Sequence, residues 1–120
     1  MKNKTLVLGA SENPGRYSNM AMLKLQDKGH EIVAVGKKSG MVNGVQISSQ
    51  PVLSDDVDTV TLYLNPDNQK PYYDYVLSLK PRRIIFNPGT ENDELEAMAA
   101  GKGIKVQEAC TLVMLGTGQY

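Results

Sequence analysis

The sequence is poor in the residues that form covalent cross-links and bind zinc. Its 120 residues include one cysteine, Cys110, and one histidine, His30. A single cysteine cannot form a disulfide within the chain, and these two residues alone cannot supply the ligands of a Cys/His zinc site. We therefore expect no disulfide framework and no metal centre.

The sequence also has no excess charge of either sign. Lysine and arginine together number 13, and aspartate and glutamate together also number 13. Such a balance gives no general electrostatic attraction to nucleic acid or to anionic lipid. We expect neither as a partner, and any site for an anionic ligand must be local.

Long apolar runs are lacking as well. The first run, Leu6–Leu8, is too short for the core of a signal peptide, and the polar segment Glu12–Pro14 soon follows it. We therefore expect a cytoplasmic protein. A hydrophobic content of 41% is sufficient for a core, and the length fits a single domain over residues 1–120.

What the sequence does contain is a regular alternation of strand-like and helix-like stretches. Five β-branched runs of strand length are bounded by Gly, Pro or Asn: Thr5–Gly9, Glu31–Gly36, Thr59–Leu64, Arg83–Pro88 and Lys105–Cys110. The segment Lys37–Asp58 is expected to be an irregular crossover that contains a short strand at Val45–Ile47.

Helical spacing of apolar residues predicts three helices, over Ser18–Lys28, Asp67–Lys80 and Thr90–Gly103. Ser18 suits an N-cap, and Thr90 with Asp93 has the spacing of a capping box. Pro71 is compatible with a helix only in its first turn. The alternation predicts an α/β Rossmann-like fold, with a parallel sheet, helices on both faces and strand order 3-2-1-4-5 for the five long runs.

The loop Gly9–Arg16, GASENPGR, follows the first long run. In this class of fold, ligands bind at the carboxyl ends of the strands, next to the first strand. Gly9 permits a tight turn, and the next helix would direct its free N–H groups at the loop. Arg16 adds a guanidinium that can bind two phosphate oxygens. We expect a phosphate site, and a turn without a ligand is the alternative.

The spacing of glycines argues against the usual NAD and ATP modes. The loop lacks the middle glycine of G-x-G-x-x-G and the Gly-Lys-Ser/Thr of a Walker A motif. After the second long run stand Lys37 and Lys38, where an NAD-binding domain usually presents an acidic residue. Two cations there favour a ribose phosphate, and hence NADP or coenzyme A (CoA). A solvated lysine pair is the alternative.

Four segments in this order resemble the stand-alone CoA-binding domain proteins: Gly9–Arg16, Asn65–Pro66, Asn87–Asn92 and the late lone Cys110. Those proteins are similar to the N-terminal domain of the succinyl-CoA synthetase α subunit and of ADP-forming acyl-CoA synthetases. The resemblance covers nearly the whole chain. It implies a Rossmann-like nucleotide-binding domain that binds CoA or an acyl-CoA.

The resemblance also implies which residues contact the ligand. They are Gly9, Ser11, Asn13, Pro14, Arg16, Lys37, Lys38, Asn65, Pro66, Asn87, Pro88 and Gly89. The loop would bind the pyrophosphate, the lysines would bind the adenosine phosphate, and the last two segments would form the walls. This chain has Gly36–Lys37 where the family often has Asn-Pro, and Thr90 where an aliphatic residue often follows the glycine.

Catalytic groups are scarce. His30 precedes the second long run, so we expect it at the opposite edge of the sheet from Ser11 and Cys110, out of reach for a catalytic triad or dyad. The synthetases in the resemblance rely on a phosphorylatable histidine and nucleotide-grasping domains that 120 residues cannot include. We therefore expect binding without catalysis by the chain alone, and an acyl-CoA-using enzyme as a candidate partner.

Several alternatives stay open. The ligand could be NADP in the service of a reductase, or the chain could be an interaction subunit that has lost its ligand. Cys110 is expected to be a small buried residue, and a mixed disulfide with CoA is the alternative. Glu12 is expected to be a solvated loop carboxylate. Asp55, Asp56 and Asp58 are expected to form a solvated acidic turn, and a weak divalent cation site is the alternative. The tail, residues 111–120, either packs on the core or exposes an apolar strip.

Overall fold

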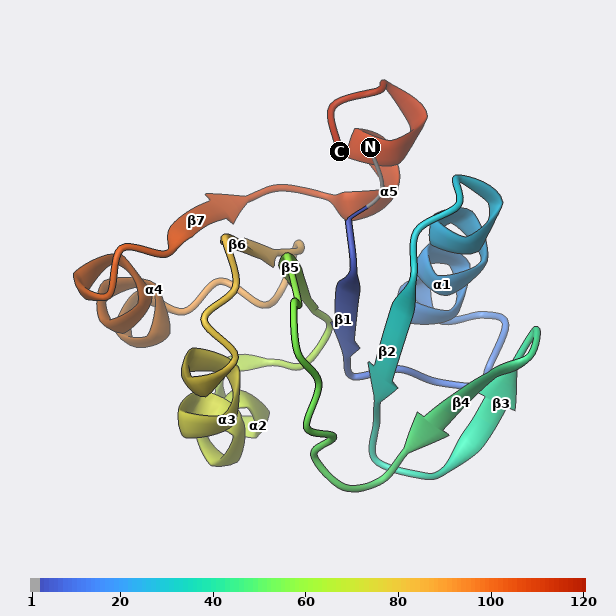
Figure 1. The fold of residues 1–120 in the computed structure, drawn as a ribbon, viewed down its shortest axis with the longest axis horizontal. Coiled ribbons are helices and arrows are strands. Elements are labelled where there is room, and N and C mark those ends of the chain that lie inside the picture. Colours follow the sequence, from blue (N-terminus) through green and yellow to red (C-terminus); the bar gives the residue numbers. More distant parts are fainter. Residues whose placement is uncertain (1–2) are drawn as a thin grey trace.

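One central sheet with helices on both faces forms the molecule, in a computed structural model that describes residues 3–120 (Figure 1). The strands are β1 (Thr5–Leu8), β2 (Ile32–Val35), β3 (Gly40–Val42), β4 (Val45–Ser48), β5 (Thr59–Leu62), β6 (Arg83–Phe86) and β7 (Lys105–Glu108). The helices are α1 (Tyr17–Asp27), α2 (Pro66–Gln69), the 3-10 helix η1 (Lys70–Tyr72), α3 (Tyr73–Ser78), α4 (Asp93–Gly101) and α5 (Thr111–Gly116). The predicted α/β Rossmann-like class is confirmed.

The central strands divide the core into two layers. Leu6 and Leu8 of β1 join a cluster with side chains of α3 and α4, whereas Val7 between them joins a cluster with side chains of α1 and α5. Successive residues of a strand point to opposite faces, so β1 supplies both layers. β1, β5 and β6 are buried along their whole length, which explains why they read as continuous apolar or β-branched runs.

The strand order departs in detail from the prediction. Across the sheet the order is β3-β4-β2-β1-β5-β6-β7. The third long run, β5, pairs in parallel with β1, and β4 pairs in parallel with β2 at the position expected for β5. The predicted order 3-2-1-4-5 of the five long runs is therefore wrong, because the segment expected to be an irregular crossover supplies the strand beside β2.

That segment contains a hairpin. β3 and β4 pair antiparallel, and Asn43 and Gly44 form the turn with φ of 46° and 85°. Asn and Gly are the residues that best tolerate this left-handed backbone in a two-residue hairpin turn. The short strand expected at Val45–Ile47 is confirmed as part of β4, and its partner β3 was missed.

All three predicted helices begin or continue differently. The helix expected over 67–80 is divided into α2, η1 and α3, because Pro71 lacks the N–H that would continue the ladder. The N-cap of α1 is Arg16, and Ser18 is buried within the first turn. The N-cap of α4 is Asn92, whose Oδ1 accepts the Leu95 N–H at 3.2 Å, and Thr90 instead donates its hydroxyl to the Asn87 carbonyl.

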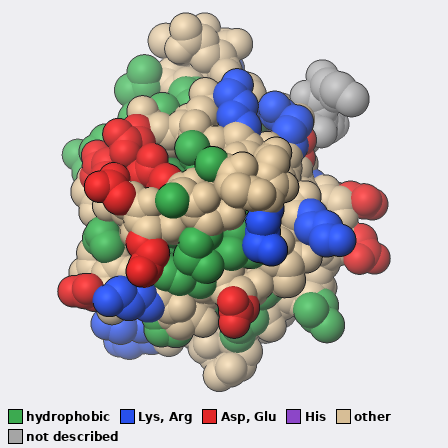
Figure 2. All heavy atoms as spheres, turned by 90° about the vertical axis from the view of Figure 1, so that its left-hand side faces the viewer, with side chains coloured by type: hydrophobic (Ala, Val, Ile, Leu, Met, Phe, Trp, Pro, Cys, Tyr) green, Lys and Arg blue, Asp and Glu red, His purple; other side chains and the backbone are tan. Residues whose placement is uncertain are grey.

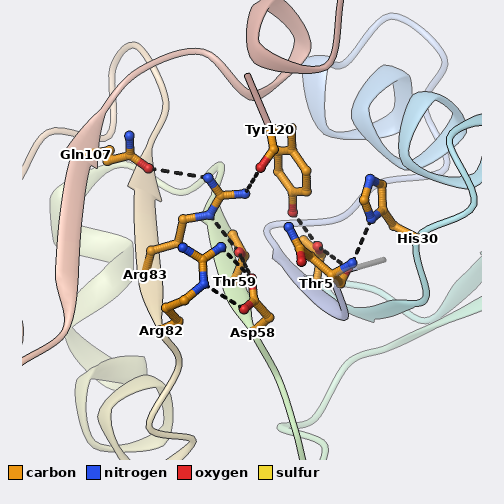
Figure 3. Close-up of polar contacts among 9 residues, drawn as sticks. Thr5, His30, Asp58, Thr59, Arg82, Arg83, Gln107 and Tyr120 are labelled. Carbon is orange, nitrogen blue, oxygen red and sulfur yellow. Dashed lines mark hydrogen bonds and ion pairs between the residues drawn. The ribbon is translucent and has the colours of Figure 1, made fainter. Parts of the chain in front are cut away.

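The tail packs on the core, which decides between the two alternatives. Leu115 of α5 belongs to the cluster beneath α1. Beyond α5, Tyr120 lies between His30 and the buried Arg83, where the amino ends of the central strands meet (Figure 3). Within residues 3–120, no helix is long and apolar enough to cross a membrane.

Candidate functional site

A cleft of about 790 Å³ opens at the carboxyl ends of the parallel strands. The carboxyl ends of β1 and β2 lie at the lower edge of the sheet in Figure 1, where their arrowheads point. The lining residues are Gly9, Ala10, Ser11, Glu12, Asn13, Arg16, Tyr17, Ser18, Lys37, Lys38, Ser39, Tyr63, Leu64, Asn65, Asn68, Pro88, Gly89 and Thr90. The loops after β1, β2, β5 and β6 therefore converge, as expected for parallel strands at a topological switch point.

Two glycines allow the loop after β1 to enter this edge. Gly9 has a φ of 98°, and a Cβ there would lie 3.0 Å from the Tyr63 carbonyl carbon. A Cβ on Gly36 would lie 2.2 Å from the Ala10 carbonyl oxygen. The N–H groups of Gly9 and Ala10 both donate to the Val35 carbonyl, at 2.8 and 3.0 Å. Close backbone packing at these two positions thus fixes where the loop begins.

The loop is braced by its own polar side chains. The Asn13 N–H donates to Ser11 Oγ at 3.0 Å, and the Gly15 N–H donates to Asn13 Oδ1 at 2.9 Å. Asn19 Nδ2, from the first turn of α1, donates to the Ser11 carbonyl at 3.0 Å. These bonds hold the loop against the start of α1.

The start of α1 is not capped by a side chain. Its N-cap, Arg16, is extended and makes no capping hydrogen bond, whereas Asn65 caps α2 and Asn92 caps α4. The first N–H groups of a helix and its dipole favour an anion at this position. The start of α1 therefore adds to the anion-binding character of the cleft.

Three cations line the cleft without an acidic partner. Within residues 3–120, ion pairs form between Lys4 and Glu31 and between Arg82 and Asp58 only. Arg16 lies on the loop after β1, and Lys37 and Lys38 lie after β2. In a chain without net charge, this grouping is a local concentration of positive charge on two sides of one cleft.

Most residues that the sequence singled out are brought together here. Pro14, Pro66 and Asn87 do not line the cleft. Asn87 is only 2% exposed, and its amide donates to Thr61 Oγ1 and the Leu62 carbonyl while its Oδ1 accepts the Thr111 N–H. Asn87, which directly follows β6, thus connects β5 to α5 through the hydrogen bonds of its buried amide.

Sequence reasoning missed several lining residues. Ala10, Tyr17 and Ser39 directly flank predicted positions, and Ser18 and Asn68 lie two residues from one, so nearness in the sequence was the available signal. Glu12 was expected to be a solvated carboxylate. It is exposed, but its Oε2 accepts the Met41 N–H at 2.8 Å.

Sequence reasoning also missed Tyr63, because this residue falls within the strand-like run predicted over Thr59–Leu64 and its ring packs against the core. Its hydroxyl is buried and, within the described chain, forms no hydrogen bond of normal geometry. Burial raises the pKa of Tyr63 to about 12, although the nearby hydroxyls of Thr61 and Thr111 act in the opposite direction. The phenol is therefore neutral at physiological pH.

Of the residues considered for a catalytic pair, Ser11 lines the cleft, whereas His30 and Cys110 do not. His30 accepts the Asn3 N–H at its Nδ1 and contacts the Tyr120 ring, at the amino ends of the strands (Figure 3). Cys110 is half-buried at the N-cap of α5 and does not line the cleft. His30 thus lies at the opposite edge of the sheet from Ser11, which lines the cleft.

Asp58, which lies away from the cleft, has structural partners. Asp58 binds Arg82 through two hydrogen bonds of 2.8 and 3.1 Å. Burial by itself would raise the pKa of Asp58, but the hydrogen bonds from Arg82 and Thr59 outweigh it and lower the pKa below its usual value. Residues 55–58 are thus not merely a solvated turn, because Asp58 connects the starts of β5 and β6.

A second acidic group lies at the start of α4 and the end of β7. Carboxylate oxygens of Asp93, Glu96 and Glu108 lie within 4.8 Å of one another. Burial and the neighbouring Glu108 carboxylate raise the pKa of Glu96. Figure 2 shows the side of the molecule that carries α4 and β7. Acidic and basic side chains occur on this face in separate small groups.

Comparisons with known proteins relate the chain to a family and to solved structures. The family model described as CoA binding domain matches residues 3–116. A crystal structure described only as that of an uncharacterized protein is 49% identical, with a TM-score of 0.97, over 100% of this chain and 99% of that chain. No curated protein sequence matches significantly.

More distant structures share the fold alone. A hypothetical protein from Pyrococcus horikoshii OT3 is 22% identical with a TM-score of 0.87, over 97% of this chain and 83% of that chain. The protein ID.343 from Thermus thermophilus is 21% identical with a TM-score of 0.86, over 99% of this chain and 91% of that chain. The architecture is thus retained where most of the sequence differs.

Proposed function

Since the chain belongs to the CoA-binding domain family, we propose that it binds CoA or an acyl-CoA in the cleft at the carboxyl edge of its sheet. The observation that carries the proposal is the grouping of Arg16, Lys37 and Lys38, which have no acidic partner, around one cleft. CoA carries a pyrophosphate and a separate 3′-phosphate. Cations on two sides of the cleft match a ligand with two separate anionic groups.

The loop after β1 is the proposed pyrophosphate site. Arg16 presents a guanidinium fork beside the uncapped first turn of α1. Lys37 and Lys38, after β2, are the proposed partners of the 3′-phosphate. Asn65, Pro88 and Gly89 from the loops after β5 and β6 form the facing walls for the rest of the ligand.

We further propose that the chain alone binds without catalysing a reaction. Its histidine lies with Asn3 and Tyr120 at the opposite edge of the sheet, which leaves Ser11 and Cys110 without an imidazole base. An enzyme that consumes or produces acyl-CoA would then be the partner that uses the bound ligand.

Isothermal titration tests the ligand. The ligand-stripped protein is titrated with CoA, 3′-dephospho-CoA and NADPH. We expect CoA to bind and 3′-dephospho-CoA to bind about tenfold more weakly, because one charge-assisted contact to the lysines is lost. Binding of NADPH without CoA would favour a reductase domain, and no binding of any of the three would favour an interaction subunit.

Variants locate the site. Arg16→Ala should weaken binding of both CoA forms about tenfold, while Lys38→Ala should reduce the difference between them. Lys28→Ala is the matched control, since this exposed lysine lies at the far end of α1. Equal effects of Lys28→Ala and Arg16→Ala would contradict a local phosphate site.

A further inference from the structure

Among the described residues that line the cleft, Glu12 is the only one with an acidic side chain. A carboxylate beside Arg16, Lys37 and Lys38 could pair with any of them and reduce the positive charge available to a ligand. Glu12 forms no such pair. Its Oε2 accepts the Met41 N–H at 2.8 Å, from the strand β3 that follows the lysines.

Gly40 provides the space for this contact. A Cβ at position 40 would lie 2.3 Å from Glu12 Cδ and 2.6 Å from its Cγ. The backbone of Gly40 lies outside the left-handed region, so its conformation does not by itself require glycine. The absence of a side chain at position 40 therefore matters for seating the Glu12 carboxylate.

The contact joins two sides of the cleft. Glu12 belongs to the loop after β1, which carries Arg16, and Met41 lies directly beyond the turn that carries Lys37, Lys38 and Ser39. A hydrogen bond to an ionised carboxylate is stronger than one between neutral groups. The hydrogen bond therefore restrains the loop after β1 relative to the turn that carries the lysines, and it holds the Glu12 carboxylate at the Met41 N–H.

We propose that Glu12 is a positioning residue that clasps the loop after β1 to β3. The clasp sets the separation of Arg16 from Lys37 and Lys38, and it keeps the Glu12 carboxylate from neutralising them. The inference rests on the proposed function, because Glu12 acts on bound CoA through these cations.

Four variants test the clasp: Glu12→Ala, Glu12→Gln, Gly40→Ala and the double variant with alanine at both positions. Glu12→Gln keeps an oxygen acceptor for the Met41 N–H, and Gly40→Ala displaces the carboxylate while keeping its charge. We expect Glu12→Ala and Gly40→Ala to bind CoA about three- to tenfold more weakly. Glu12→Gln should retain at least wild-type affinity, and the double variant should be no weaker than Glu12→Ala.

Hydrogen exchange of the Met41 N–H without ligand is the second readout. Exchange should be faster in Glu12→Ala and Gly40→Ala than in the wild type, and intermediate in Glu12→Gln, whose neutral amide oxygen accepts a weaker hydrogen bond. Glu94→Ala, which removes an exposed acid from α4, is the matched control and should leave exchange and CoA affinity unchanged.

CoA affinity and Met41 exchange together distinguish a failure of the proposed function from a failure of the proposed clasp. If the wild type does not bind CoA, the proposed function fails, and Met41 exchange alone decides whether the clasp exists. Unchanged Met41 exchange in Glu12→Ala overturns the clasp. If exchange responds as expected but Glu12→Ala and Gly40→Ala bind CoA as tightly as the wild type or more tightly, the positioning role is overturned.

Discussion

Tyr63 shows how one residue serves the cleft and the core at once. Its backbone lies against Gly9 and lines the cleft, while its ring packs against the cluster beneath α1 and α5. The buried hydroxyl lacks a hydrogen bond of normal geometry, and burial raises the pKa to about 12. A buried polar group without a partner is destabilising.

At this scale we predict that Tyr63→Phe is at least as stable as the wild type at pH 8, with a gain of up to about 1 kcal/mol. Tyrosine in the unfolded chain ionises near pH 10. The raised pKa therefore contributes stability that is complete below pH 10 and is lost as the pH rises toward 12. Tyr63→Phe should show a smaller loss over this interval.

Urea unfolding at pH 8, 10 and 11 checks this prediction. Tyr75 and Tyr120 also have pKa values raised by burial, so the informative quantity is the difference between variant and wild type. A clear loss of stability in Tyr63→Phe at pH 8 would mean that the hydroxyl has a stabilising partner.

At the scale of elements, Asn92 connects the helices on one face of the sheet. It caps α4 through Leu95, and its Nδ2 donates to Gln69 Oε1 at 2.9 Å and to the Tyr73 hydroxyl at 2.8 Å. Gln69, in turn, donates to the carbonyls of Leu64 and Thr90, which lie at the cleft. Two buried amides, those of Asn92 and Gln69, thus connect α2, α3 and α4 to the two cleft walls.

We predict that Asn92→Ala lowers the free energy of unfolding by about 2–3 kcal/mol, because it removes a cap and leaves buried partners unsatisfied. Asn65→Ala is the matched control. It removes the exposed cap of the four-residue helix α2 and should cost about 1 kcal/mol or less. Denaturant unfolding of both variants measures the difference, and equal losses would contradict the role of the buried network.

At the scale of the whole molecule, the two edges of the sheet differ. The carboxyl edge is open as the cleft, while the amino edge is covered by the tail (Figure 3). Arg83 is 3% exposed, donates from Nη2 to the Tyr120 carbonyl at 2.7 Å, and lies 4.4 Å from the Tyr120 ring centroid. The Tyr120 hydroxyl contacts Thr5 Oγ1, which brings the tail onto β1.

We predict that Tyr120→Ala lowers the free energy of unfolding by about 2 kcal/mol, because it exposes the Arg83 environment and removes the ring above the guanidinium. Tyr120→Phe keeps the ring and should cost less than about 1 kcal/mol. CoA affinity of the folded protein should be unchanged in both, since the cleft lies at the other edge. Denaturant unfolding and titration measure the two properties, and a parallel loss of CoA affinity would show that the edges are coupled.

The sequence predicted the parts of this molecule that depend on local chemistry. β-branched runs gave the strands β1, β5 and β6 because those strands are buried on both faces, and Asn43–Gly44 marked a turn because few other residues accept its backbone. The loop after β1 and the lysines after β2 could be predicted to meet, since parallel strands place their carboxyl ends at one edge. One helix was predicted over residues 67–80, with Pro71 accepted in its first turn, and the structure divides this stretch into α2, η1 and α3.

The tertiary structure alone decided what depends on contacts between distant segments. The position of β4 beside β2 depends on hydrogen bonds between strands, which periodicity does not encode. Asn87 entered the core because α5 supplied an N–H for its Oδ1. The exposed Glu12 reaches the Met41 N–H because Gly40, 28 positions away along the chain, leaves room for its carboxylate. The sequence by itself thus determined the elements and the chemistry of the loops. Packing decided which of those polar groups form hydrogen bonds within the fold and which remain available to a ligand.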